Sequence, residues 1–327
     1  MQDVTDRDFW GVIKEYGGPD VYFTEYFRVY RGSHLNKYIL QSITRNPTSR
    51  PVVAQLIGND IPELVRTARE LQEHPVSGID LNLGCPAPIV YRKCAGGGLL
   101  RDLTLVDAIV GALRQAVIKV PFSVKTRLGF DDDRAFPELL SLLRKHSIDL
   151  LTVHGRTVSQ KYQPPVNYAR IAEAVGAMNC PVVANGDVLS AEKGMEVLGQ
   201  TGAAGLMIGR PAIRNPWIFQ QFRQLHAGGQ PSYPAGREVM RYIFVLFEAL
   251  GAPGFSEISH IQRVKKHLNF LGPGVDERFL DRVRRMRTRA ELEGICREFL
   301  DHERPMRMAG ELTPRRRGAE SLPSPAV

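Results

Sequence analysis

Between residues 20 and 210, short apolar runs alternate regularly with longer segments that carry apolar residues at three- and four-residue spacing. The longer segments have the periodicity of amphipathic helices. The short runs are continuously apolar, which is typical of strands buried on both faces of a parallel sheet. They read, in chain order, DVYFTEY, PVVAQLIG, GIDLNLG, FSVKTRLG, LLTVHGRT, PVVANGDV and GLMIGR. This repeated strand–helix unit predicts an α/β fold.

The seven runs are one strand short of the eight that a closed (β/α)₈ barrel requires. The deficit lies at the front, because the chain starts with the loop-like MQDVTD and no apolar run precedes it. Either the sheet is open, or the first strand of a barrel is absent from the sequence. We predict a TIM (β/α)₈ barrel whose first strand is truncated.

The character of the chain changes past roughly residue 225. The stretch HAGGQPSYPAG has the composition of a linker. Only helical patterns follow it, and they are rich in arginine. The last two dozen residues have too few apolar groups to offset the entropy of ordering them. We therefore predict a barrel domain over residues 1–225, a small all-α domain over 235–303 and a disordered tail over 304–327.

The composition is that of an ordinary globular protein, with 43% hydrophobic and 24% charged residues. The four cysteines lack CxxC spacing, which argues against a metal site. No apolar run approaches the length of a membrane span, and no signal peptide opens the chain. We expect a cytoplasmic protein with free thiols, no metal and no membrane contact, for which a monomer is adequate. The net charge of +8 favours an anionic partner.

Polar side chains stand at the carboxyl end of six of the predicted strands. In a parallel barrel these ends share one face, and active sites are built there. Strands must also leave a sheet through polar turns, so one or two such residues would mean little. Six strands with Lys, His, Arg, Asn, Gln and Cys at their ends favour an active face. The residues are Gln55, Asn82, Cys85, Lys125, Arg127, His154, Arg156, Asn185, Gly186, Asp187, Gly209 and Arg210.

The last two of these strand ends, ANGDV and MIGR, have the features of a phosphate site. Glycines let backbone N–H groups approach an anion, and an arginine can add a bidentate contact. The loops after strands seven and eight of such barrels often hold a phosphate. Two ordinary tight turns would give the same letters, and Pro211 removes a donor where a phosphate would need one. The pair of motifs favours a cofactor that carries a phosphate.

Two single residues stand out within this set. Lys125 lies inside an apolar strand and needs a partner, which is either a flavin ring or a carboxylate of the barrel. Cys85 lies between Gly84 and Pro86, on a turn that leaves its strand. A thiol there can donate a proton or act as a nucleophile, although a cysteine is often only a small buried hydrophobe. The other cysteines are interpreted as structural: Cys94, Cys180 and Cys296.

The order of the motifs resembles that of the dihydrouridine synthase family over residues 1 to about 220. The motifs that carry the resemblance are MQDVTDRDF, VAQLIG, IDLNLGCPAP, GGGLLRD, VKTRLGF, VHGRT, ANGDV and MIGR. The resemblance implies a barrel with a helical second domain, the cofactors FMN and NADPH, and transfer RNA as substrate. The implied reaction reduces uridine to 5,6-dihydrouridine. NADPH would reduce FMN, the flavin would deliver hydride to C6 of a flipped uracil, and Cys85 would protonate C5.

The resemblance also assigns the remaining site residues. Asn82, Arg127 and Tyr162 would hold the uracil. The helical segments QRVKKH and DRVRRMRTR would supply phosphate contacts to the RNA. Gln55 and Lys125 would bind the flavin ring, Met1 would take the place of a methionine beside it, and the phosphate would be surrounded by His154, Asn185, Gly186, Asp187, Gly209 and Arg210.

The sequence departs from the family pattern at its start. Met1 stands where the methionine of an Ala-Pro-Met motif is usual, so we expect a misplaced start codon to have removed the first strand. A true truncation would open a seam beside the flavin. Two other functions remain open: an FMN barrel that acts on a free pyrimidine such as dihydroorotate, and an RNA-binding derivative without flavin. A colourless preparation that resists FMN would favour the second of these.

Overall fold

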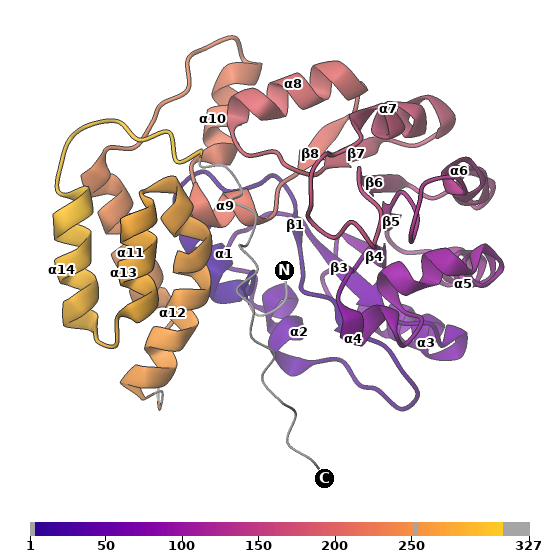
Figure 1. The fold of residues 1–327 in the computed structure, drawn as a ribbon. Coiled ribbons are helices and arrows are strands. Elements are labelled where there is room, and N and C mark those ends of the chain that lie inside the picture. Colours follow the sequence, from indigo (N-terminus) through magenta and orange to yellow (C-terminus); the bar gives the residue numbers. More distant parts are fainter. Residues whose placement is uncertain (1–3, 252–253, 255, 310–327) are drawn as a thin grey trace.

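The computed structural model describes residues 4–251, 254 and 256–309. The strands form one curled parallel sheet, with helices on its outer side and further helices beside it (Figure 1). The order within the sheet is β1-β3-β4-β5-β6-β7-β8, and β2 also pairs with β3. The strands are β1 (Tyr22–Phe23), β2 (Phe27–Arg28), β3 (Val52–Ile57), β4 (Gly78–Leu83), β5 (Phe122–Arg127), β6 (Leu150–His154), β7 (Val182–Asn185) and β8 (Gly205–Met207). The predicted fold class is confirmed.

The first predicted strand is split into β1 and β2, which both pair with β3. The break falls at residues 24–26, where the Thr24 hydroxyl accepts a hydrogen bond from the backbone N–H of Gln55 at 3.1 Å. The eight assigned strands therefore correspond to the seven apolar runs. In the described part of the chain no ladder joins β8 to β1, so the curled sheet has a seam between these two strands.

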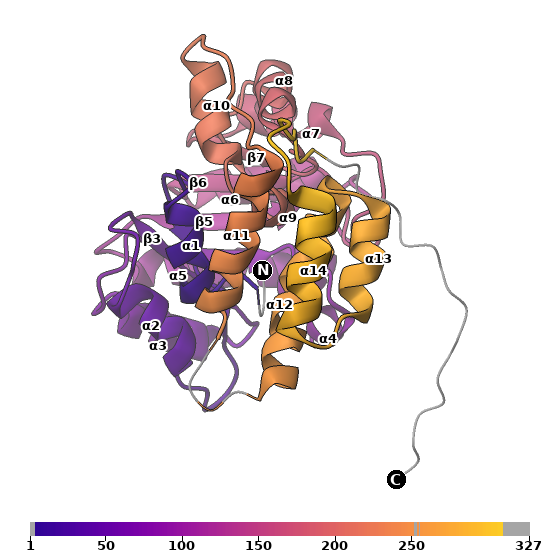
Figure 2. The same ribbon diagram turned by 90° about the vertical axis from the view of Figure 1, so that its left-hand side faces the viewer.

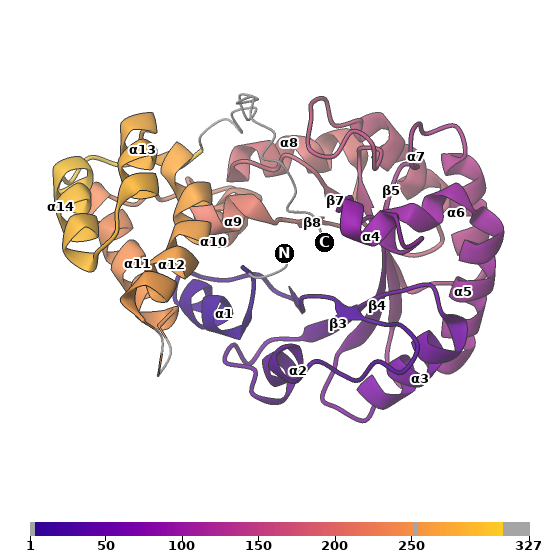
Figure 3. The same ribbon diagram turned by 60° about the horizontal axis from the view of Figure 1, so that its bottom comes forward.

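Helices on the outer side of the sheet connect the strands, as Figure 3 shows for α2, α3 and α5 to α8. Most begin at a side chain that accepts a backbone N–H bond, among them Asn36, Asp60, Asp102, Asn167 and Ser190. The long helices are α1 (Arg7–Lys14), α2 (Lys37–Thr44), α3 (Ile61–Leu71), α5 (Leu103–Ala116), α6 (Phe136–Lys145), α7 (Tyr168–Ala177), α8 (Ala191–Thr201) and α10 (Ile218–His226). The short ones are α4 (Pro88–Tyr91), η1 (Gly96–Arg101) and α9 (Arg210–Arg214).

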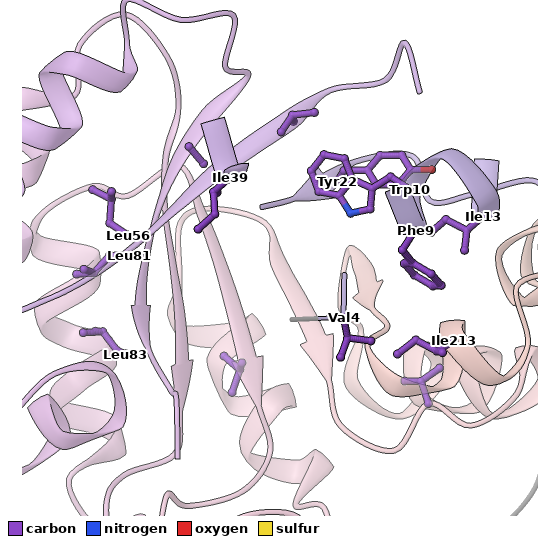
Figure 4. Packing of buried hydrophobic residues seen from close by; sticks show 14 of the residues in the cluster. Val4, Phe9, Trp10, Ile13, Tyr22, Ile39, Leu56, Leu81, Leu83 and Ile213 are labelled. Atoms are coloured by element: carbon purple, nitrogen blue, oxygen red, sulfur yellow. The ribbon is translucent and has the colours of Figure 1, made fainter. Parts of the chain in front are cut away.

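Alternation along the strands separates an apolar outer face from a polar inner one. Leu56, Leu81 and Leu83 point away from the strands on the side where the helices lie (Figure 4). Successive side chains of a strand point to opposite faces. Gln55, Asp80 and Asn82 are therefore directed to the interior of the curled sheet. So are the alternate residues of β5 and β6: Ser123, Lys125, Arg127, Thr152 and His154.

The C-terminal helices pack against the seam side of the barrel, next to α1 and α9 (Figure 2). Tyr242 donates a hydrogen bond to the carbonyl of Ile213 at 2.9 Å, and His267 Nε2 donates to that of Val4 at 2.9 Å. Arg263 forms ion pairs with Asp6 and Asp8. These helices are α11 (Gly236–Ala249), α12 (Glu257–Leu271), η2 (Gly272–Gly274), α13 (Glu277–Arg285) and α14 (Arg289–Leu300).

The start of the predicted disordered tail is packed. Met306 donates its backbone N–H to the carbonyl of Pro234 at 2.8 Å, and Met308 is buried. Residues 304–309 are thus held beside the start of α11 by backbone pairing and by the buried side chain of Met308. The rest of the predicted tail, residues 310–327, and Met1 lie outside the described residues.

Candidate active site

The register of the sheet brings the predicted site residues onto neighbouring strands. Asn82 lies beside Lys125, and Arg127 lies beside His154, which in turn lies beside Asn185. All these strands are parallel, so their carboxyl ends meet at one mouth of the curled sheet. The clustering expected from the sequence is present in the structure.

Cys85 lies on a turn that hydrogen bonds hold from two sides. The Oδ1 atom of Asn82 accepts the backbone N–H groups of Gly84 and Cys85, both at 2.9 Å. The second support comes from η1, where the Gly97 N–H donates to the Cys85 carbonyl at 3.2 Å. A Cβ atom on Gly97 would lie 2.9 Å from that carbonyl oxygen. The glycine run of η1 is therefore needed for its close approach to the turn, and the Cys85 side chain stays partly exposed.

Tyr26 is a site residue that the sequence analysis missed. Its hydroxyl interacts with the Cys85 thiol, and its ring lies under the guanidinium of Arg28. Burial, with the Cys85 sulfur as a second cause, raises the pKa of Tyr26 to about 12. The apolar run DVYFTEY places Tyr26 inside a strand and does not predict the break between β1 and β2. The available signal was an aromatic hydroxyl at the carboxyl end of the first apolar run.

Lys125 lies deep in the interior of the sheet but keeps some accessible surface. Burial lowers its pKa to about 8, and the nearby Arg127 adds to the shift while Asp80 opposes it. Within the described residues its ammonium group makes no hydrogen bond or ion pair. The barrel carboxylate considered as its partner, Asp80, instead accepts from Ser123 at 2.6 Å and from Gln55 at 2.8 Å. Lys125 therefore presents an unsatisfied cation to the interior.

Arg127 is almost completely buried and is fixed by three backbone carbonyls. Nε donates to Gly84 at 2.9 Å, and Nη1 donates to Thr157 and Lys161, both at 2.7 Å. These bonds tie the Cys85 turn to the loop that carries Tyr162. Burial is the main cause that lowers the pKa of Arg127, to about 10. One edge of its guanidinium group remains for another partner.

His154 is buried among cations and is therefore neutral near pH 7. Burial lowers its pKa well below the usual value, and Arg127, Lys125, Arg156 and Arg210 add to the shift. Arg156 is neutralised by a bidentate ion pair with Asp187, whose Oδ1 lies 3.0 Å from Nη1. Arg210 makes no ion pair in the described part of the chain and stacks on Tyr162, 4.1 Å from the ring centroid.

The two predicted phosphate loops lie side by side through the pairing of β7 with β8. Asn185 Nδ2 donates to the Met207 carbonyl at 2.7 Å. Gly186 has a φ of +123°, and a Cβ there would lie 3.2 Å from the His154 ring. Gly209 precedes α9, and Pro211 occupies its first turn, where a helix has no use for the N–H. Pro211 is therefore explained by its position in the first turn of α9.

Tyr162 stands at the mouth of the site and is 50% exposed. Arg127 and Arg210 lie over the ring of Tyr162, and the ring centroid of His154 lies 6.5 Å from that of Tyr162.

Asp80 is a second residue that the sequence analysis did not select. It lies beside Ser123, two positions before Lys125 on the neighbouring strand. Its signal was an aspartate in an apolar run, two positions before Asn82 and so on the same face.

Among the residues that the structure describes, no group of three or more His, Cys, Asp or Glu side chains is gathered to hold a metal ion. None of the described helices is long and apolar enough to cross a membrane.

Comparisons with known proteins place this geometry in context. The sequence profile described as "Dihydrouridine synthase (Dus)" matches residues 1–276. A tRNA-dihydrouridine(16) synthase of Neisseria meningitidis serogroup A is 30% identical over 312 residues, which cover 93% of each chain. A tRNA-dihydrouridine synthase B of Xanthomonas axonopodis pv. citri is 38% identical over 222 residues, 67% of this chain and 66% of that protein. The chain thus spans about two thirds of the latter relative.

The solved structures extend the likeness at the level of fold. An old yellow enzyme homologue from Zymomonas mobilis superposes with a TM-score of 0.51 at 13% identity, over 68% of this chain and 84% of that one. Identity at this level supports the curled parallel sheet alone.

Proposed function

The chain belongs to the dihydrouridine synthase family, and from this premise we propose that it reduces uridines of transfer RNA to 5,6-dihydrouridine, with FMN as cofactor and Cys85 as proton donor. The observation that supports the proposal most directly is the placement of Cys85. Its partly exposed thiol lies on a hydrogen-bonded turn at the mouth of an interior that contains an unpaired lysine.

The interior fits FMN on three observations. Lys125 and Arg210 form no ion pair within the described residues, although Asp80 and Asp187 lie near enough to act on them, so both cations remain available to an anionic ligand. The Thr152 hydroxyl is buried on the same inner face and finds no hydrogen-bond partner among the residues that the structure describes. At Gly186 a side chain would meet His154, so the glycine keeps the backbone open beside the cations. Lys125 and Gln55 would bind the ring, and the phosphate would be held by His154, Asn185, Gly186, Asp187, Gly209 and Arg210. Asp187 would contribute its backbone N–H, because its carboxylate is paired with Arg156.

When bound and reduced by NADPH, FMN supplies a hydride for C6 of the uracil. Cys85 holds the proton destined for C5 and delivers it from the turn after β4. Tyr26 keeps its own proton at neutral pH because its pKa is raised, so its hydroxyl can donate to the sulfur once Cys85 has given up its proton. The neutral His154 adds no charge of its own to the anion site.

The groups predicted to hold the uracil have a limited number of free atoms. Both acceptor positions of Asn82 Oδ1 are used by backbone N–H groups, so only an N–H of its amide can reach a substrate. Arg127 offers its remaining guanidinium edge, since its other N–H groups are bound to carbonyls. Tyr162 offers an exposed ring on which a flipped base can stack.

The RNA would lie across a group of exposed side chains from the end of β2 and from the segments that follow β2, β4 and β6, which we call the rim patch. Its cations take part in no ion pair within the described residues, and its two tyrosines are 63% and 83% exposed. Cations bind phosphates, and exposed aromatic rings stack with bases. The rim patch consists of Arg28, Tyr30, Arg31, Lys37, Tyr38, Lys93 and Lys161. This surface favours RNA over a free pyrimidine as substrate.

We propose that the uridine at position 16 of transfer RNA is the one that is reduced. The relatives that match both the barrel and the helices, over 93% and 92% of their lengths, are tRNA-dihydrouridine(16) synthases. The B-type relatives match only about two thirds of this chain. Because the helices pack against the barrel and would contact RNA together with it, we take the match that includes the helices as the more informative.

The experiment uses the purified chain, FMN, NADPH and transfer RNA that lacks dihydrouridine. The expected product is dihydrouridine at position 16, mapped by reverse transcription after alkaline cleavage. Dihydrouridine at another position would contradict the assignment of the site alone. A colourless protein that does not take up FMN and makes no dihydrouridine would refute the proposed function.

A further inference from the structure

Three side chains beneath the Cys85 turn form a continuous line of hydrogen bonds. Gln55 Nε2 donates to Asp80 Oδ2 at 2.8 Å, and Asn82 Nδ2 donates to Gln55 Oε1 at 2.8 Å. The line ends at Asn82 Oδ1, which accepts the N–H groups of Gly84 and Cys85. All three side chains are buried. We call this line the amide relay.

The direction of the amide relay is fixed at the end near Cys85. Backbone N–H groups only donate, so Asn82 must turn its oxygen to the turn and its NH₂ group to Gln55. Gln55 must then turn its own NH₂ group to residue 80. Residue 80 must therefore accept, and an ionised carboxylate can do nothing else. Its second oxygen is occupied by the Ser123 hydroxyl at 2.6 Å.

From this geometry we propose that Asp80 is a positioning residue for Cys85, acting through the amides of Gln55 and Asn82. The proposal rests on the proposed function, because it concerns the acid of that reaction. Asp80 has no exposed surface, so it does not touch a substrate. What it supplies is an acceptor at a fixed point, without which either amide can rotate and release the turn. Proton transfer from Cys85 slows when the thiol is out of position, even if the thiol itself is chemically unchanged.

The relay can be separated from the negative charge of Asp80. An asparagine at position 80 can present its carbonyl oxygen to Gln55 while its NH₂ group donates to the Ser123 hydroxyl, which accepts as readily as it donates. Asp80→Asn therefore keeps the relay and removes the charge near Lys125. Asp80→Leu fills a similar volume, removes the same charge and leaves no acceptor. The two variants form a matched pair.

The first measurement is the rate at which enzyme already reduced by NADPH converts transfer RNA. We expect Asp80→Asn to stay within about threefold of the parent and Asp80→Leu to be slower by about tenfold or more. The reduction of FMN by NADPH is recorded separately, so a loss there is not counted. Equal losses in both variants would assign the effect to charge and overturn the proposal, as would an Asp80→Leu rate equal to that of the parent.

The second measurement needs neither RNA nor flavin. Alkylation of Cys85 by iodoacetamide is followed by peptide mass spectrometry, with the exposed Cys94 as internal reference. We expect about threefold or faster labelling of Cys85 in Asp80→Leu and in Gln55→Met, which breaks the relay without touching Asp80, and no change in Asp80→Asn. If Asp80→Leu does not fold, Gln55→Met decides the question. Unchanged labelling in the relay-breaking variants overturns the proposal, even if the parent makes no dihydrouridine and the proposed function has failed.

Discussion

The rim patch and the C-terminal helices are both rich in cations, but they differ in what those cations contact. On the rim, Arg28, Arg31 and Lys161 have no acidic partner within the described residues. Most arginines of α12 to α14 are paired. The pairs are Arg263 with Asp6 and Asp8, Arg278 with Asp276, Arg282 with Glu298, Arg284 with Asp281, Arg289 with Glu248 and Glu293, and Arg297 with Glu293.

Exposed ion pairs of this kind add little stability, about 0 to 1 kcal/mol each, but they cancel the local potential that attracts RNA. A count of arginines therefore overstates the capacity of the helices to bind RNA. Within the described residues, the cations of the rim patch are all free of ion pairs, whereas the helices keep only a minority of theirs free, such as Lys266 and Arg285. Recognition and chemistry would then share one face of the barrel.

The most severe test separates the two functions of that face. Cys85→Ala should lower dihydrouridine formation by about 100-fold or more, because the proton donor is lost. Binding of FMN and of transfer RNA should not change, since the rim patch is intact. Turnover is measured by mass spectrometry of nucleosides, and binding by filter retention. Turnover equal to that of the parent would remove Cys85 from the mechanism.

The second test removes free cations from the rim. A triple replacement of Arg28, Arg31 and Lys161 with Ala should weaken transfer RNA binding by roughly 10- to 100-fold and reduce the slope of log K against log salt by up to about three. FMN content serves as the control for folding. Unchanged binding of transfer RNA in the triple variant would show that the rim patch is not the surface that binds RNA.

A third test extends the comparison to the unpaired cation of the interior. The pKa of Lys125 is lowered to about 8, so its charge is present below pH 8 and lost as the pH rises through that value. The affinity for FMN, measured by quenching of flavin fluorescence, should fall roughly tenfold between pH 7 and 9. Lys125→Met should bind weakly at all pH values and flatten the profile. A parent profile as flat as that of the variant would exclude Lys125 from the FMN site.

The smallest effect is expected in the helices. Replacing Arg284 and Arg285 with Ala removes one arginine that is paired with Asp281 and one that is free of such a partner in the described residues. We expect transfer RNA binding to weaken by less than about threefold. A loss larger than that of the rim variant would reverse the ranking of the two surfaces.

The sequence predicted the fold because each apolar run has the length and composition of a buried strand. It also predicted which residues meet at the mouth, since parallel strands bring their carboxyl ends together. The split of the first strand was not predictable, because it depends on the Thr24 hydroxyl taking the place of a backbone acceptor. Tyr26 and Asp80 were missed for a related reason: their importance comes from side-chain contacts with Cys85 and Gln55 rather than from a motif.

Sequence patterns also could not predict which acidic residues pair with the arginines of the helices. Arg282 meets Glu298 and Arg289 meets Glu248 from different helices, so the partners are set by helix packing. Local spacing finds only pairs three or four residues apart, such as Arg284 with Asp281. Which cations stay available for RNA is therefore a property of the folded chain.

Because the barrel has a seam between β8 and β1, the C-terminal helices that pack beside this seam contribute to the stability of the barrel. Tyr242 and His267 contact the backbone of α9 and of the segment before α1, the two elements nearest the seam. A chain cut after α10 would leave the apolar faces of α1 and α9 in water. The faces of α11 and α12 that touch the barrel are thus constrained by folding. Residues on the outward surfaces of α13 and α14 can therefore be replaced at a smaller cost in stability than residues on the faces that touch the barrel.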